Sequence, residues 1–218
     1  MDKKKLLFGT VIAFLALSVL YFLPVRIPFK QVFPMALLFV AGCLLQSWPI
    51  VAAVFFSALG DGFGAAHQFL PQMGAFAVAH LFFIAYFLSL GLKNKRAKGA
   101  PVQGWWFALV TLFAVVVYYY ASEKIIFFAP EGVVRTGMYV YAGLIAVMMW
   151  SALMQRDWLW GIGAVLFVFS DCVLAVNKFV RPIPDARYWI MVSYYAAQLL
   201  IFVRAAMERQ GWKRLSAS

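Results

Sequence analysis

Long apolar stretches, separated by short polar or charged segments, run through this chain of 218 residues. A helix that crosses a bilayer needs about 20 mostly apolar residues, and eight windows approach that description. The windows are continuously apolar and do not alternate with a period of two, so the pattern excludes a transmembrane β-barrel. It predicts an all-α, polytopic integral membrane protein with eight transmembrane helices. The predicted helices, with an error of about two to four residues at each end, cover 6–23, 33–47, 49–64, 74–92, 105–121, 134–155, 158–178 and 188–207.

The windows occupy nearly the whole chain and leave no stretch for a separate soluble domain. We therefore expect residues 1–218 to form a single transmembrane helical domain. The second and third windows are short, so re-entrant or interrupted forms of these two helices stay open. The first window lacks a small-residue cleavage site, and we expect it to be retained. The composition agrees, because 65% of the residues are hydrophobic, 12% are charged and the mean hydropathy is +0.86, well above that of soluble domains.

The net charge of +11 does not indicate a nucleic-acid partner. The basic residues cluster between the apolar windows and form no groove with interleaved aromatic residues. With the amino terminus inside, the inner segments hold twelve of the nineteen Lys and Arg residues and the outer segments hold seven. Because cytoplasmic segments of membrane proteins carry an excess of Lys and Arg, both termini are predicted to be cytoplasmic.

The most hydrophilic segment, KNKRAKGAP at 93–101, divides the windows into two sets of four. We expect this segment to be a linker. In each set the third window carries an aspartate near its outer end, and these two residues, Asp61 and Asp171, are 110 positions apart. Four crossings per set give corresponding helices the same direction, so the halves are candidates for a parallel 4+4 pseudo-repeat.

Asp61 and Asp171 are the two carboxylates, of eight in the chain, that lie inside apolar windows. A charged side chain at the centre of a spanning helix costs about 2.5 to 3.5 kcal/mol on insertion scales, so such residues usually face a cavity and have a function there. Both fall late in helices that are predicted to run outward, which puts them in the outer half of the membrane. The alternative for Asp61 is a structural role, in capping or cross-linking helices.

Polar side chains of the returning helices fall at a similar predicted depth. His80 lies about two turns into the fourth helix, and Tyr194, Tyr195 and Gln198 lie about two turns into the eighth, at about 1.5 Å per residue. A lone buried histidine is often a satisfied core donor, but two nearby carboxylates favour a functional role. Gln198 serves either as a contact between helices or as a ligand contact. His67, in the short outer loop, is expected to be solvated. We expect about one of five tyrosines near this side to face inward and the rest to lie among the headgroups: Tyr118, Tyr119, Tyr120, Tyr139 and Tyr141.

Spacing adds candidates around Asp61. Ser57 precedes it by four residues and therefore shares its helical face. Three neighbouring glycines, Gly60, Gly62 and Gly64, allow a close approach of another helix or local unwinding.

Spacing also adds candidates around Asp171. Ser170 precedes it, and Asn177 and Lys178 follow about two turns later. Lys178 lies on nearly the same face as Asp171. Its ammonium group either contacts a lipid phosphate, with Arg181 as helper, or only extends to the headgroup region for solvation.

Several segments resemble a known family: LGDGFGA at 59–65, GAFAVAHLFFIAYF at 74–87, FSDCVLAVNKF at 169–179 and YYAAQLLI at 194–201. The chain resembles the lysoplasmalogenase, or YhhN-like, membrane proteins over most of its length from the third window onward. This resemblance implies an eight-span hydrolase that cleaves the vinyl ether bond of lysoplasmalogens, releasing a fatty aldehyde and glycerophosphoethanolamine or glycerophosphocholine. Position by position, the family's motif residues fall on Asp61, His80, Ser170, Asp171, Asn177, Lys178, Tyr195 and Gln198.

Hydrolysis of a vinyl ether needs one acid and one anion, because protonation of the carbon distal to oxygen gives an oxocarbenium ion that water then captures. We expect one aspartate to be the general acid and the other to stabilise the cation and position the water, in either order. The expected catalytic residues are Asp61, Asp171 and His80. The expected substrate-binding residues are Ser170, Asn177, Lys178, Tyr195 and Gln198. We expect no cofactor and no resident metal.

Two other classes of function stay open. Paired intramembrane acids also serve as cation or proton sites in transporters, although the outer-half placement and the lack of an inverted repeat count against this class. A metal-dependent lipid amidase or esterase, built on Asp61, Asp171 and His80, is the third class. In each case the expected partners are the lipid bilayer and, for an enzyme, a lysophospholipid substrate, with no nucleic acid. The expected location is a bacterial inner membrane.

Overall fold

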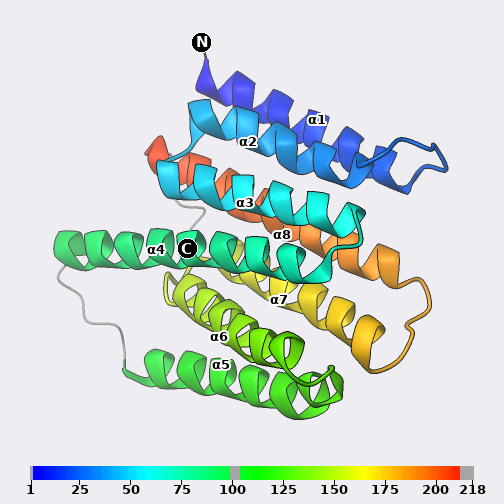
Figure 1. Ribbon diagram of the computed structural model, residues 1–218. Helices are drawn as coiled ribbons and strands as arrows, with labels where there is room; N and C mark the ends of the chain where they lie inside the picture. Colours follow the sequence, from blue (N-terminus) through cyan, green and yellow to red (C-terminus); the bar gives the residue numbers. More distant parts are fainter. Residues whose placement is uncertain (1, 99–103, 212–218) are drawn as a thin grey trace. The chain divides into compact units, whose positions relative to one another are not determined.

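The structure, a computed structural model, describes residues 2–98 and 104–211, without the side chains of residues 94–98. Over these residues the chain forms eight α-helices and two short 3-10 helices and no β-strand, which confirms the predicted all-α class (Figure 1). The elements are α1 (Lys3–Phe22), η1 (Lys30–Val32), α2 (Phe33–Leu45), α3 (Trp48–Ala65), α4 (Phe69–Lys98), α5 (Gly104–Lys124), η2 (Ile126–Phe128), α6 (Val133–Leu153), α7 (Trp158–Phe179) and α8 (Ala186–Arg209).

Seven helices in the described part of the chain are long and apolar enough to cross a membrane. This finding confirms a multi-pass membrane protein. The helix that does not qualify is α2, which has 13 residues and corresponds to one of the two short windows. The eighth crossing and the cytoplasmic location of both termini stay predictions. Many apolar side chains of the spans are exposed, as on α5, where Leu112 is 63% exposed and Val116 is 53% exposed. Such surfaces suit contact with lipid.

The observed helices match the predicted windows within three residues at every end except the two ends of α4. This helix starts at Phe69 and ends at Lys98, whereas the prediction was 74–92. Pro71 does not prevent the early start, because proline is tolerated in the first turn of a helix. The late end follows from a run of Lys, Arg and Ala, which are good helix formers. The prediction of a linker over 93–101 was therefore wrong for residues 93–98; the rest of it lies outside the described residues.

Contacts between Cα atoms group the chain into two compact units. Unit 1 comprises Met1–Phe83 and Gln198–Ser218, and unit 2 comprises Ile84–Ala197. The helices α4 and α8 each contribute residues to both units, so the grouping does not follow the division that the hydrophilic segment suggested. The single domain and the 4+4 pseudo-repeat stay predictions.

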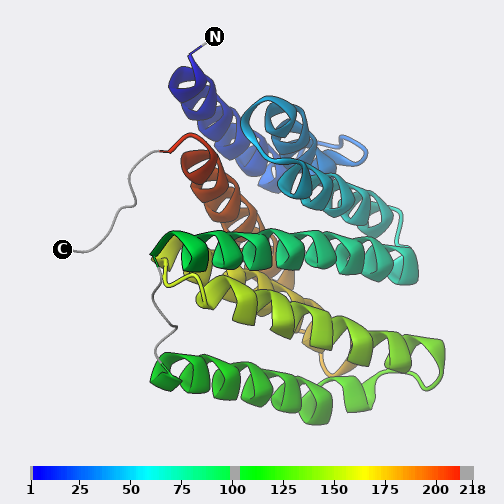
Figure 2. The same ribbon diagram turned by 90° about the vertical axis from the view of Figure 1, so that its left-hand side faces the viewer.

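In unit 1, α1, α2 and α3 lie side by side (Figures 1 and 2). Proline stands in the first turn of α2 and of α3, at Pro34 and Pro49, where its missing N–H costs no helical hydrogen bond. The last part of α8 is tied to α2, because Gln46 Nε2 donates to the carbonyl oxygen of Phe202 at 2.7 Å. This contact lies within unit 1, near the start of α3.

In unit 2, α5, α6 and α7 lie in sequence order (Figure 1). The indole nitrogen Nε1 of Trp150 on α6 donates to Thr111 Oγ1 on α5 at 3.0 Å. Trp160 on α7 is 1% exposed and packs edge-on against Phe87, with 5.1 Å between the ring centroids. These contacts join α5 to α6 and α4 to α7. The helix α6 also packs against α7, which carries the second aspartate.

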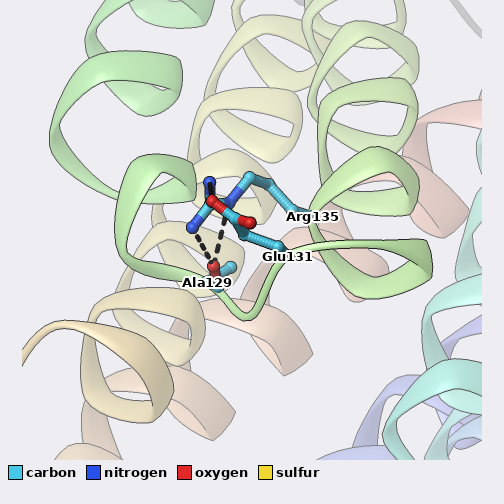
Figure 3. Close-up of polar contacts among 3 residues, drawn as sticks. All are labelled: Ala129, Glu131 and Arg135. Atoms are coloured by element: carbon cyan, nitrogen blue, oxygen red, sulfur yellow. Dashed lines mark hydrogen bonds and ion pairs between the residues drawn. The ribbon is translucent and has the colours of Figure 1, made fainter.

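The connection between α5 and α6 is held by Arg135 (Figure 3). Its Nε and Nη2 atoms donate to the carbonyl oxygen of Ala129 at 2.9 and 2.7 Å, and Nη1 donates to Glu131 Oε1 at 3.0 Å. The guanidinium carbon also lies 5.9 Å from the centre of the Phe127 ring. One side chain therefore closes the loop and sets the start of α6, the helix that carries Tyr141.

Candidate active site

Asp61 lies near the end of α3 and is buried, with 4% of its surface exposed. Ser57, one turn earlier on the same face, is also buried, as the spacing predicted. Gln198 Nε2 on α8 donates to Ser57 Oγ at 3.0 Å. The predicted candidates Ser57 and Gln198 are therefore in direct contact within unit 1.

A second glutamine reaches Asp61 from the connection between α1 and α2. Gln31, in η1, donates through Nε2 to the backbone carbonyl oxygen of Asp61 at 2.5 Å. The sequence analysis missed Gln31, because this residue lies in an irregular connection where periodicity carries no information. The bond ties the connection between α1 and α2 to the last part of α3.

The glycines around Asp61 differ in their surroundings. A Cβ atom at Gly60 would lie 2.9 Å from the ring of Phe76 on α4, and one at Gly64 would lie 2.6 Å from Gln72 Nε2. The prediction of a close approach is confirmed at these two positions. At Gly62 the same atom would meet nothing within 4 Å, so the prediction was wrong there. No unwinding occurs, because α3 is helical throughout this stretch.

The two histidines differ in exposure. His80 lies in α4 within unit 1 and is fully buried. His67 follows α3, is exposed, and has a left-handed backbone with φ of 60°. The expectation of a solvated loop residue is confirmed for His67.

In unit 2, Asp171 on α7 is half-buried and accepts a hydrogen bond from the phenol of Tyr141 on α6. The distance from Tyr141 Oη to Asp171 Oδ2 is 2.5 Å. The other four tyrosines that the sequence analysis grouped with Tyr141 are exposed, which suits a position among lipid headgroups. No feature of the sequence singled out Tyr141 among the five, because only the packing of α6 against α7 does so.

Ser170 and Asn177 both bond to the backbone of unit 2. Ser170 Oγ donates to the carbonyl oxygen of Ile190 on α8 at 2.9 Å. Asn177 Oδ1 accepts from the backbone N–H of Ile183 at 2.9 Å, which stabilises the connection between α7 and α8. Ser170 Oγ and Asn177 Oδ1 therefore both have hydrogen-bond partners in the backbone.

The remaining candidates of unit 2 lie at the ends of its helices or in its core. Lys178 is exposed, and its ammonium group lies 5.8 Å from the centre of the Phe179 ring. Arg181 is exposed as well. Tyr194 and Tyr195 are both buried, and the two rings are 5.5 Å apart.

The predicted site residues are thus distributed over both units. Asp61, His80 and Gln198 belong to unit 1, and Ser170, Asp171, Asn177, Lys178 and Tyr195 belong to unit 2. The pairing of the two aspartates stays a prediction. Over the residues that the structure describes, neither unit gathers three or more His, Cys, Asp or Glu side chains in an arrangement that could hold a metal ion.

The fold and the carboxylates inside the helices define a multi-pass helical membrane protein with polar groups inside its spans. The chain belongs to the YhhN family, whose family model matches residues 25–205. This match includes α2 to α7 and most of α8, and so extends further toward the amino terminus than the segments that carried the resemblance.

Several relatives carry the name lysoplasmalogenase. The human protein named lysoplasmalogenase TMEM86A is 31% identical over 74% of this chain and 66% of its own. Human lysoplasmalogenase TMEM86B is 38% identical over 70% of this chain and 61% of its own. A lysoplasmalogenase of Mycobacterium tuberculosis is 29% identical over 70% of this chain. This chain spans 58% to 66% of the length of these three relatives. No solved structure gives a significant match.

Proposed function

We propose that this protein is a lysoplasmalogenase. In this reaction, a lysoplasmalogen and water give a fatty aldehyde and glycerophosphoethanolamine or glycerophosphocholine. The observation that carries the proposal is the similarity to human and mycobacterial proteins of that name over 70% to 74% of this chain. The carboxyl groups inside the spans add support, because they are the groups that such a reaction needs.

The proposed reaction begins when a carboxyl group protonates the vinyl carbon distal to the ether oxygen. The electron pair of the double bond forms the new C–H bond, and the other carbon shares its positive charge with the oxygen. Water adds to this carbon and gives its proton to a carboxylate. The resulting hemiacetal breaks its bond to the glycerol oxygen, which takes a proton from a carboxyl group, while the hemiacetal hydroxyl gives its proton to a carboxylate and becomes the aldehyde oxygen. One water molecule is consumed, and both carboxyl groups return to their starting states.

We assign the role of the anion to Asp171 and the role of the proton donor to Asp61. Tyr141 donates to Asp171 Oδ2, so this oxygen acts as an acceptor in this arrangement. A carboxylate held by such a bond is suited to stabilising an oxocarbenium ion without reorganisation. Asp61, which is buried in unit 1, then supplies the proton.

The other proposed site residues orient these groups or bind the lipid. His80, Tyr195 and Gln198 are buried and are proposed to orient the carboxyl groups and the water. Lys178 is exposed at the end of α7 and is proposed to contact the lipid phosphate, with Arg181 as helper.

Ser170 and Asn177 are proposed to shape the substrate site through their bonds to the backbone. These bonds fix α7 to α8 and fix the connection between them. Both residues therefore set where the exposed cations at the end of α7 lie.

The proposal is tested with purified protein and no added cofactor. The substrates are a 1-alkenyl lysophosphatidylethanolamine and the 1-acyl lipid of the same chain length. We expect fatty aldehyde from the alkenyl lipid and no free fatty acid from the acyl lipid. D61N and D171N preserve shape but remove the proton chemistry, and each is expected to lower kcat by about a hundredfold or more. The control is D185N, which changes an exposed aspartate.

Three results would contradict the proposal. The first is a folded D61N or D171N protein with aldehyde release like that of D185N. The second is fatty acid released from the acyl lipid alone, which would indicate an esterase. The third is ion or proton flux in proteoliposomes from a protein that releases no aldehyde, which would indicate a transporter.

We further propose a bacterial inner membrane as the location of this protein. The mycobacterial relatives support this, because they show that bacteria carry members of the family. Separation of inner and outer membranes, followed by immunoblotting, tests the location.

A further inference from the structure

Unit 2 contains an apolar groove that none of the proposed site residues lines. The groove has a volume of about 580 Å³ and lies between the start of α5, the connection from α6 to α7, and one face of α7. One end is polar and aromatic, with Trp106, Arg156, Asp157 and Trp158, whereas the rest is aliphatic.

The polar end of the groove is built by backbone and side-chain contacts. Arg156 has a left-handed backbone, with φ of 52°, and its guanidinium carbon lies 5.7 Å from the centre of a Trp106 ring. Trp106 Nε1 donates to the carbonyl oxygen of Leu153 at 3.3 Å. Asp157 caps α7, because its Oδ1 accepts from the backbone N–H of Leu159 at 3.1 Å. A positive and a negative side chain are thus held next to each other at one end of the groove.

The aliphatic part of the groove follows a single face of α7. Its residues recur at the spacing of one helical face, from Trp158 through Ile162 and Val165 to Leu166. Ile162 is 45% exposed and Val165 is 39% exposed. The eight residue steps from Trp158 to Leu166 give about 12 Å of helix length at about 1.5 Å per step. This shape is suited to a hydrocarbon chain lying along the helix.

We propose that this groove binds a zwitterionic phospholipid at a site separate from that of the proposed hydrolysis. The phosphate contacts the exposed guanidinium group of Arg156, which is suited to phosphate oxygens. The lipid ammonium contacts Asp157 and the face of Trp158, since indole rings attract cations. One acyl chain lies against Ile162 and Val165. The two tryptophans support this occupant, because tryptophan is enriched at the depth of lipid headgroups.

The two charged side chains, Arg156 and Asp157, also determine which lipid headgroup fits the groove. A phosphatidylglycerol has the phosphate but no ammonium, and a diacylglycerol has neither group. Complementarity to both Arg156 and Asp157 therefore favours phosphatidylethanolamine over these two lipids. A diacyl lipid contains no vinyl ether, so its binding is independent of the proposed hydrolase activity.

The test uses native mass spectrometry of the purified full-length protein in detergent. The added lipids are dioleoyl phosphatidylethanolamine, dioleoyl phosphatidylglycerol and dioleoylglycerol, in separate titrations. We expect R156Q to bind phosphatidylethanolamine about tenfold more weakly, since it loses a hydrogen bond to a charged group. D157N keeps the helix cap, because Asn caps as well as Asp, and is expected to lose the preference for phosphatidylethanolamine over phosphatidylglycerol. The control is R26Q, which removes an exposed arginine from the connection between α1 and α2.

Wild-type protein that binds phosphatidylglycerol or dioleoylglycerol as tightly as phosphatidylethanolamine would overturn the proposal. So would an R156Q protein that binds like R26Q. A thermal melt of each variant in the same detergent separates lost binding from lost folding. If R156Q unfolds early, R156K provides the second variant: it keeps the charge but not the planar donor group, and is expected to weaken binding less than R156Q.

Discussion

At the scale of single residues, each of the two aspartates inside the spans, Asp61 and Asp171, accepts a hydrogen bond from another segment of the chain. Gln31 bonds to the carbonyl oxygen of Asp61, and Tyr141 bonds to the carboxylate of Asp171. The Gln31 contact holds the backbone of Asp61 in place, whereas the Tyr141 contact holds the carboxyl group of Asp171, which is the proposed reactive group. The second contact is therefore expected to have the larger effect on chemistry.

Y141F is expected to lower kcat for aldehyde release by about tenfold or more. The reason is that a hydrogen bond to a charged group contributes about 1.5 to 3 kcal/mol, and this bond orients the proposed anion. The KM value should change little, because the phenol holds a catalytic group and not the lipid. Steady-state kinetics on the alkenyl lipid measures both constants. Y139F, an exposed tyrosine on the same helix, is the matched control. Equal kcat values for the two variants would contradict the proposed role of Tyr141.

At the scale of elements, the approach of α4 to α3 depends on a glycine beside Asp61. The ring of Phe76 occupies the space where a side chain at Gly60 would lie. Gly62 is two residues further along the same helix and has open space around its Cα. The two glycines thus separate the effect of packing from the effect of helix propensity.

G60A is expected to lower the melting temperature in detergent, whereas G62A should leave it unchanged or raise it. Alanine favours a helix over glycine at both positions, by about 0.8 to 1 kcal/mol. At Gly60 the new methyl group must displace a buried ring, and overpacking of this kind costs about 1 to 3 kcal/mol. In a protein of this size each kcal/mol shifts the melting temperature by about 2 to 4 °C. Equal melting temperatures for the two variants would show that the α3–α4 approach is loose.

At the scale of the whole molecule, the chain forms two compact units, and each unit contains one aspartate inside a spanning helix. Our proposal assigns the two acids to one reaction. If both act in the same step, the loss of either one should remove most of the rate. Removal of the second acid should then lower the rate little further.

The double variant D61N/D171N is therefore expected to release aldehyde at nearly the same rate as the slower single variant. If each acid acted at a separate site, the two rate losses would multiply. Single-turnover kinetics of the wild type, both single variants and the double variant distinguishes these outcomes. A double variant about a hundredfold slower than either single variant would show that the acids act independently.

Much of the fold follows from hydropathy, because the cost of placing polar groups in lipid restricts where helices begin and end. Sixteen helix ends were predicted, and α4 accounts for both that miss by more than three residues. Its late end is set by helix-forming polar residues, which hydropathy does not detect, and its early start includes Pro71, which the first turn of a helix tolerates. The buried positions of Asp61, His80 and Gln198 were also predictable, since each lies within an apolar stretch.

The sequence by itself determined the membrane-spanning helices and the acids that stand out in them, because both follow from the local composition of one segment. Only the tertiary structure decided the partners of those acids. It selected Tyr141 from five tyrosines, brought Gln31 to Asp61, and showed that Gly60 and not Gly62 lies in a close contact. The physical reason is that a hydrogen bond or a close approach depends on the rotation and distance of a second helix. Those quantities arise from packing across the whole unit and have no counterpart in the periodicity of one segment.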